Sequence, residues 1–188
     1  AGLRIAVERF RHAPIDAVPL LALRMIFSLP FFLVSAFVAS RRATNIKFTG
    51  SQWFYVALVG CLGYYISSLL DFIGLQYVSA GIERLILFIY PTMVLLISAI
   101  TSKVRVSRYQ WIAVLVTYAG LFLAFSGEVN ITGSYSREFY AGSMLIFGCA
   151  LTYAIYLVGS GKIIPVIGAA KFNSYAMTFA CIAVLLHY

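Results

Sequence analysis

Six stretches of apolar residues follow one another along the chain, and short polar segments separate them. The stretches are continuous rather than alternating, and about 20 helical residues are enough to cross the hydrocarbon core of a bilayer. Strands are not expected, because an open sheet exposed to lipid leaves backbone groups without hydrogen-bond partners. The pattern predicts membrane-spanning helices, antiparallel to their neighbours because the connections are short, at 19–39, 53–75, 82–101, 109–126, 139–160 and 170–188.

The composition supports the same fold class, an all-α polytopic transmembrane helix bundle. Hydrophobic residues make up 62% of the 188 residues and charged residues 11%, against about 45–50% and about 25% in soluble domains. A soluble chain of this size cannot bury so much apolar surface, which excludes a soluble enzyme domain, a disordered segment and a disulfide scaffold. We therefore expect membrane lipids to surround the chain.

The distribution of charge predicts the orientation of the helices. The net charge is +8, but the basic residues form no single patch, so a nucleic-acid partner is not expected. The segments after the first, third and fifth predicted spans contain basic residues and no acidic one, which places them in the cytoplasm by the positive-inside rule. Arginines in the N-terminal segment argue mildly against this orientation. The eight basic residues are Arg41, Arg42, Lys47, Lys103, Arg105, Arg108, Lys162 and Lys171.

The second predicted span carries small and polar residues at helical spacing on one face, with Tyr64 beside them. Small residues allow close helix packing in lipid, so one interpretation is a packing seam. The other is a face that lines a cavity, and Asp71 favours it, because a carboxylate facing lipid is costly. The stripe consists of Gly60, Gly63, Ser67, Asp71 and Gly74.

The third predicted span begins with Glu83 and Arg84 and contains Tyr90 and Pro91 near its middle. Pro91 lacks a backbone donor and crowds the preceding turn, so it predicts a kink. Glu83 and Arg84 either extend outward to the membrane surface, or Arg84 pairs with Asp71 at the outer mouth of a cavity.

The fifth predicted span has a stripe of its own, made of Gly142, Cys149, Tyr153, Tyr156 and Ser160. The two tyrosines either present hydroxyls and ring faces to a solute or belong to an interfacial aromatic belt. No metal-ligand spacing, phosphate-binding loop or catalytic set is visible. We therefore expect neither an enzyme nor a metal or other cofactor, and we expect the cysteines to be buried thiols.

Several segments have an order typical of one carrier family. An aromatic-rich helix with Gly63-Tyr64-Tyr65 leads into Leu75-Gln76-Tyr77-Val78-Ser79-Ala80, and a helix with a central proline at Pro91-Thr92 follows. Next come Gln110-Trp111 with Leu115 and Gly120, and later Leu151-Thr152-Tyr153-Ala154-Ile155-Tyr156. In this order the chain resembles EamA-type carriers of the drug/metabolite transporter superfamily. It departs from them in the loop at 103–106, which has only basic residues where the family often has an acidic one.

The resemblance implies a fold of ten helices in two inverted five-helix repeats. On that template residues 1–127 are helices two to five of the first EamA repeat, and 128–188 are helices six and seven, which begin the second. The chain would then be a fragment without the first and the last three helices.

The resemblance also implies a function: a secondary transporter (permease) of small organic metabolites, such as amino acids or drugs, in the cell's inner membrane. The mechanism would be alternating access around a central cavity. A membrane-embedded interaction or structural protein that transports nothing is the alternative. A homo-oligomer is left open. The candidates for lining the solute path are Tyr64, Ser67, Asp71, Tyr90, Pro91, Tyr153 and Tyr156, and those for gating or ion coupling are Asp71, Glu83 and Arg84.

Overall fold

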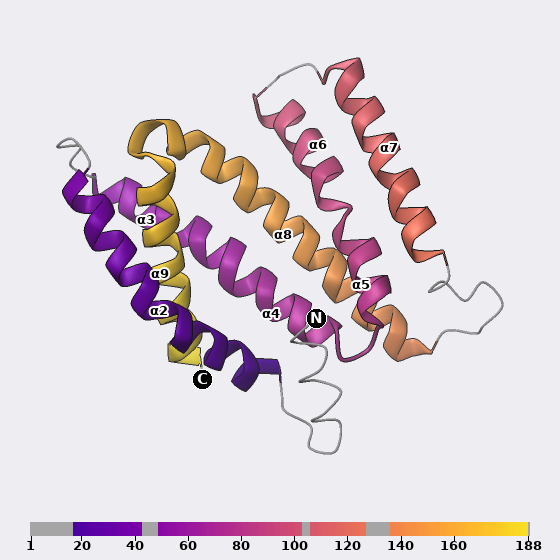
Figure 1. Ribbon diagram of the computed structural model, residues 1–188, viewed down its shortest axis with the longest axis horizontal. Coiled ribbons are helices and arrows are strands. Elements are labelled where there is room, and N and C mark those ends of the chain that lie inside the picture. Colours follow the sequence, from indigo (N-terminus) through magenta and orange to yellow (C-terminus); the bar gives the residue numbers. More distant parts are fainter. Residues whose placement is uncertain (1–16, 43–48, 103–105, 127–135, 188) are drawn as a thin grey trace.

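The computed structural model describes residues 17–42, 49–102, 106–126 and 136–187. In these ranges the chain is helical and has no strand (Figure 1). The helices are α2 (Ala17–Arg42), α3 (Gly50–Gly60), η1 (Cys61–Ile66), α4 (Ser67–Gly74), α5 (Ala80–Leu87), α6 (Tyr90–Ser102), α7 (Arg108–Phe125), α8 (Arg137–Ile167) and α9 (Ala169–His187).

The helices confirm the predicted fold class and its six apolar spans. Those long and apolar enough to cross a membrane cover 19–38, 50–74, 80–101, 108–125, 137–167 and 169–187. Most of the predicted boundaries lie within three residues of these. The predicted connections at 43–48, 103–105 and 127–135 lie outside the described residues.

The end of the fifth span was predicted wrongly. We expected it to end near Ser160, but α8 continues to Ile167, and Gly168 alone connects it to α9. Glycines and Pro165 suggest a loop there, yet the helix continues and pairs its backbone groups within the segment. Gly168 ends the helix with a φ of +86°, a left-handed conformation that glycine tolerates, and its N–H donates to the Ile164 carbonyl at 2.8 Å.

The third span is broken where Pro91 predicts a kink. Phe88 and Ile89 separate α5 from α6, because Pro91 cannot donate a backbone hydrogen bond to the preceding turn. Ile89 N–H instead donates to the Ile86 carbonyl at 3.1 Å, a tighter turn than in an α-helix. Tyr90, the first residue after the break, has its ring 5.3 Å from that of Tyr153 on α8.

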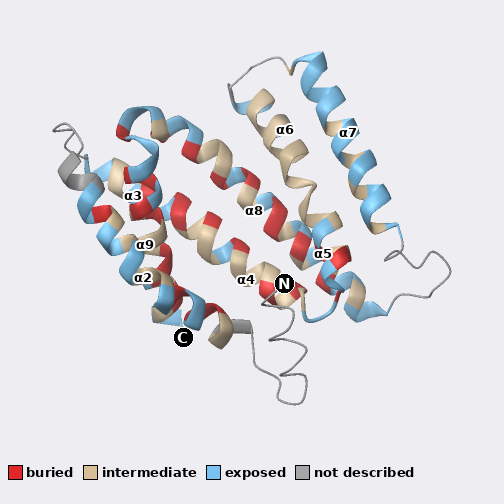
Figure 2. Cartoon of the chain, viewed as in Figure 1, coloured by how far each residue is buried: buried red, intermediate tan, exposed pale blue. Residues whose placement is uncertain are grey.

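The core of the bundle lies where α9 meets the earlier helices (Figure 2). One cluster joins α2, α4 and α9 around Leu21, Met25 and Phe72. A second joins α3, α8 and α9 around Val56 and Phe172. Because α9 contributes to both, it connects the first span to the fifth.

The right-hand edge in Figure 1 is formed by α7, none of whose residues is buried. It contacts α5, and the hydroxyls of Thr92 on α6 and Tyr118 on α7 lie 2.6 Å apart. Large apolar side chains such as Leu115, Val116 and Leu123 are exposed on it. In a membrane-spanning helix such side chains face lipid or another helix.

Candidate functional site

The span formed by α3, η1 and α4 turns its stripe of small and polar residues into the bundle. Gly60, Gly63, Ser67 and Gly74 are buried. Asp71 is half-buried, and its Oδ1 atom is fully buried. The inward-facing stripe predicted from the spacing is therefore confirmed.

Three glycines of this stripe allow other helices to approach closely. A Cβ atom on Gly60 would lie 2.7 Å from the Ala176 backbone on α9, and one on Gly74 would lie 3.0 Å from the Gly142 carbonyl on α8. A Cβ on Gly63 would overlap the Tyr156 side chain. At these positions the stripe is a packing seam, one of the two interpretations that the sequence leaves open.

Asp71 and Ser67 differ from the glycines because they bring polar atoms into the seam. The Ser67 hydroxyl donates to the Gly63 carbonyl of its own span. Asp71 Oδ1 has no hydrogen-bond donor among the residues that the structure describes. A buried carboxylate oxygen without a donor is costly and marks a place where a ligand or a proton would be accommodated.

Asp71, Glu83 and Arg84 form what we call the acid–arginine group, at the junction of α4, α5 and α8. Glu83 is 4% exposed, and its carboxyl contacts that of Asp71 within hydrogen-bonding reach. Arg84 Nε lies 3.3 Å from Glu83 Oε2. Two carboxyl groups in contact share one cation, so the group is short of positive charge unless a proton or another cation joins it.

The predicted pair between Asp71 and Arg84 is wrong as a direct ion pair. In the described part of the chain Arg84 pairs with Glu83, and it acts on Asp71 only over a longer distance. The expectation that both Glu83 and Arg84 extend outward is also wrong for Glu83. The Glu83 side chain is 5% exposed, whereas that of Arg84 is 59% exposed. The helix α5 contacts both α8 and α7, and of the two adjacent side chains only that of Glu83 is buried.

Two further groups lie within electrostatic reach of the two carboxyls. Arg24 on α2 is exposed and acts on Asp71 through space. Cys149 on α8 is buried and lies within electrostatic reach of both Asp71 and Glu83. Cys149 belongs to the α8 stripe, so the stripe connects this group to the tyrosines further along the helix.

Tyr64, Tyr90, Tyr153 and Tyr156 come together and form what we call the tyrosine cluster. The Tyr64 and Tyr156 hydroxyls lie 2.7 Å apart, and their rings are 4.9 Å apart. The Tyr153 ring lies 5.3 Å from that of Tyr90 and 5.7 Å from that of Tyr156. Tyr156 is only 6% exposed, which argues against an interfacial belt for this residue, because belt tyrosines reach the headgroups.

Two members of this region come from α9 and carried no signal in the sequence. The Tyr64 hydroxyl donates to Asn173 Oδ1 at 2.5 Å, and the Phe172 ring stacks on Tyr156 with centroids 6.1 Å apart. Neither residue belongs to a recognisable motif. Only the pairing of α9 with η1 and α8 brings them here.

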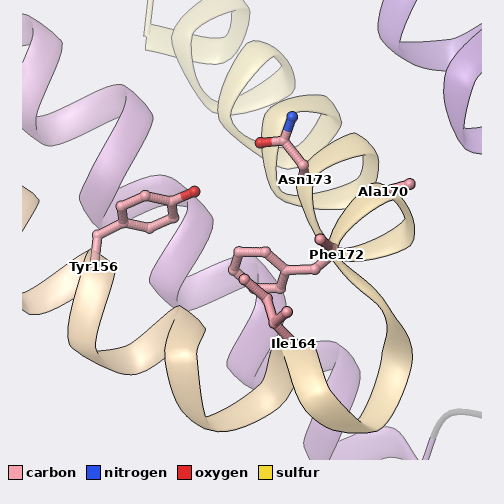
Figure 3. Close-up of a pocket in the computed structure, with 6 residues that line it drawn as sticks. Tyr156, Ile164, Ala170, Phe172 and Asn173 are labelled. Carbon is pink, nitrogen blue, oxygen red and sulfur yellow. The ribbon is translucent and has the colours of Figure 1, made fainter.

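A pocket of about 380 Å³ opens beside this cluster, between the end of α8 and the beginning of α9 (Figure 3). Tyr156 and Asn173 are the lining residues with polar groups in their side chains. The remaining lining is apolar and consists of Ile164, Ala169, Ala170 and Phe172. An apolar pocket with few polar groups is typical of sites for small organic molecules. No cluster of metal-ligating side chains occurs among the described residues.

Comparisons with known proteins agree with this architecture. Residues 2–126 match the EamA-like transporter family. The chain is 33% identical over 176 residues, 92% of its length, to "Uncharacterized transporter YcbK" of Bacillus subtilis (strain 168). It spans about half of that relative, 53% of its length. No solved structure matches. The chain is therefore a multi-pass membrane protein and belongs to the EamA-like transporter family.

Proposed function

We propose that this protein is a secondary transporter of small organic metabolites, such as amino acids or drugs, that works by alternating access in the cell's inner membrane. The observation that carries the proposal is the buried face of α8. Cys149 on this face lies within electrostatic reach of two acids, and Tyr153 and Tyr156 follow one and two turns later. This line of polar and aromatic groups ends beside the pocket of about 380 Å³.

The proposal divides the chain into two repeats. Residues 1–127 would be the first EamA repeat and residues 128–188 the beginning of a second, so that α8 and α9 belong to the second repeat. In support, α8 and α9 pack against α2, α3 and α4 rather than only against each other. Sites at the interface between repeats are typical of secondary transporters.

The two polar groups would have different roles. The tyrosine cluster would line the solute path, because tyrosine offers an apolar ring and a hydroxyl in one side chain. Pro91 would contribute indirectly by breaking the span so that Tyr90 reaches Tyr153. The acid–arginine group would serve ion coupling or gating, because intramembrane acids are retained mainly where they face partners or water.

Transport by the full-length protein in proteoliposomes tests this function. A panel of radiolabelled amino acids and drug-like solutes would be offered with and without a proton gradient. We expect saturable uptake of at least one solute, and we expect Tyr156→Phe to change its KM. Tyr109→Phe is the matched control, because Tyr109 is 82% exposed on α7. If no solute in a broad panel is transported, the alternative of a non-transporting membrane interaction or structural protein is favoured.

A further inference from the structure

The second span is not a uniform α-helix. Between α3 and α4 the chain forms the π-helical turn η1, Cys61–Ile66. A π-helical turn bonds each N–H to the carbonyl five residues earlier, so it holds more residues than an α-helical turn. Such turns are rare and occur mostly as single insertions in α-helices, frequently at functional sites.

The position of η1 is determined by close contacts with two other spans. Gly60, just before the turn, lies against Ala176 on α9, and Gly63 within it lies against Tyr156 on α8. Neither position has room for a side chain. The π-helical turn therefore occurs where the backbone of this span is held most tightly between α8 and α9.

Tyr64 is the residue of η1 whose side chain joins both partners. Its hydroxyl lies 2.7 Å from the Tyr156 hydroxyl on α8 and 2.5 Å from Asn173 Oδ1 on α9. A hydroxyl that contacts two helices in this way requires one rotational position of the backbone that carries it. In this structure the two hydrogen bonds are made with η1 in its π-helical form.

Converting η1 to an α-helical turn would move everything that follows it. One residue corresponds to about 100° of rotation and about 1.5 Å of rise in an α-helix. Asp71 lies after the turn, so the same conversion would rotate it away from Glu83. The backbone of one span thus connects the Tyr64 hydrogen bonds to the contact between the two acids.

We propose that η1 is a switch: the span changes between a π form, in which Tyr64 bonds to α8 and α9 and Asp71 contacts Glu83, and an α form, in which both contacts are released. The part that this switch would play in transport rests on the proposed function. The change of helical register, in contrast, is a property of the purified protein and requires no solute. The two can therefore fail independently.

Cysteine pairs on either side of η1 test the switch. After the turn, a Cβ on Gly148 would lie 3.5 Å from Leu70 Cδ1; before it, a Cβ on Gly159 would lie 3.4 Å from Val59 Cγ2. The pairs Leu70→Cys/Gly148→Cys and Val59→Cys/Gly159→Cys would be placed in full-length protein whose three native cysteines are alanine. The measured quantity is the rate of disulfide formation under mild oxidation in nanodiscs.

Tyr64→Phe removes the hydroxyl but keeps the ring, so it should favour the α form. We expect the Leu70/Gly148 rate to fall at least about threefold, as the loss of one or two hydrogen bonds implies, while the Val59/Gly159 rate stays unchanged. Tyr65→Phe is the matched control: Tyr65 is the next residue of η1, and its hydroxyl bonds to His187 Nδ1 at 2.8 Å. It should change neither rate.

The remaining outcomes overturn the switch. Equal falls at both pairs would indicate general loosening of the span rather than a change at η1. Unchanged rates at both pairs would show that the Tyr64 hydroxyl does not determine which of the two forms the span adopts. A fall confined to the Val59/Gly159 pair would locate the movement before the turn.

Discussion

Glu83 and Arg84 are adjacent in sequence and form an ion pair of 3.3 Å, yet they occupy opposite environments. The glutamate side chain is 5% exposed and the arginine side chain 59% exposed. The arginine thus supplies a positive charge from the outside to a carboxyl group inside the bundle. A buried charge that loses its partner is strongly destabilising, so the folded protein needs Arg84 to offset the cost of burying the Glu83 carboxylate.

Replacement of Arg84 by alanine should therefore destabilise the protein. We expect a loss of about 1–2 kcal/mol, below the about 3–5 kcal/mol of a fully buried pair because Arg84 is largely exposed. Thermal unfolding in detergent measures it, with Arg137→Ala, an exposed arginine that begins α8, as the control. The double variant Glu83→Gln/Arg84→Ala should recover part of the loss. Equal destabilisation by both alanine variants would contradict this account.

The sequence was sufficient to predict the six spans and the face of the second span that points into the bundle. Both depend on local rules: the length of an apolar run, and the helical spacing that brings Gly60 and Ser67 to one side. The break before Pro91 was predictable for the same reason, because the missing N–H is a property of that residue alone.

The partners across the bundle were not predictable from these rules. Asn173 and Phe172 join Tyr64 and Tyr156 only because α9 packs against η1, a contact between residues 109 positions apart in the case of Tyr64 and Asn173. The environments of the charged residues could not be predicted for a related reason. Helical spacing does not decide which of the adjacent residues Glu83 and Arg84 is buried, because that depends on how α5 packs against other helices such as α7 and α8.

The close packing of the second span against the fifth predicts a second effect on folding stability. Gly63→Ala should destabilise the protein by about 1–3 kcal/mol, as is typical of overpacking, because the added methyl group would overlap Tyr156. Gly120→Ala is the matched control, since it lies on α7 with open space around its Cβ position. Unfolding midpoints of the two variants measure the difference. Equal midpoints would mean that Tyr156 moves aside without cost.

The orientation can be tested by labelling. Single cysteines at Asn45, Arg105 and Gly161 in a cysteine-free background should not react with an impermeant maleimide in intact cells, because the positive-inside rule places these positions in the cytoplasm. Each should react once the cells are permeabilised. Ser136→Cys, at the opposite end of α8 from Gly161, is the control and should react in intact cells. Labelling of any two of the three positions in intact cells would reverse the proposed orientation.

Asp71→Asn separates the stability of the acid–arginine group from its proposed role in coupling. Asparagine has the shape of aspartate, and its amide can donate to the Glu83 carboxyl, which Asp71 contacts. The substitution removes one of two neighbouring acidic groups, and a neutral amide oxygen takes the place of the buried carboxylate oxygen that lacks a donor, so we expect folding stability to be unchanged or higher. Transport driven by a proton gradient should fall at least about tenfold if this carboxyl takes part in coupling, since an amide cannot carry the proton. Glu138→Gln, an exposed acid in the first turn of α8, is the matched control. Uptake rates in proteoliposomes and unfolding midpoints, measured on the same preparations, give both quantities. A stable Asp71→Asn protein with the full gradient-driven rate would show that Asp71 only packs in the seam.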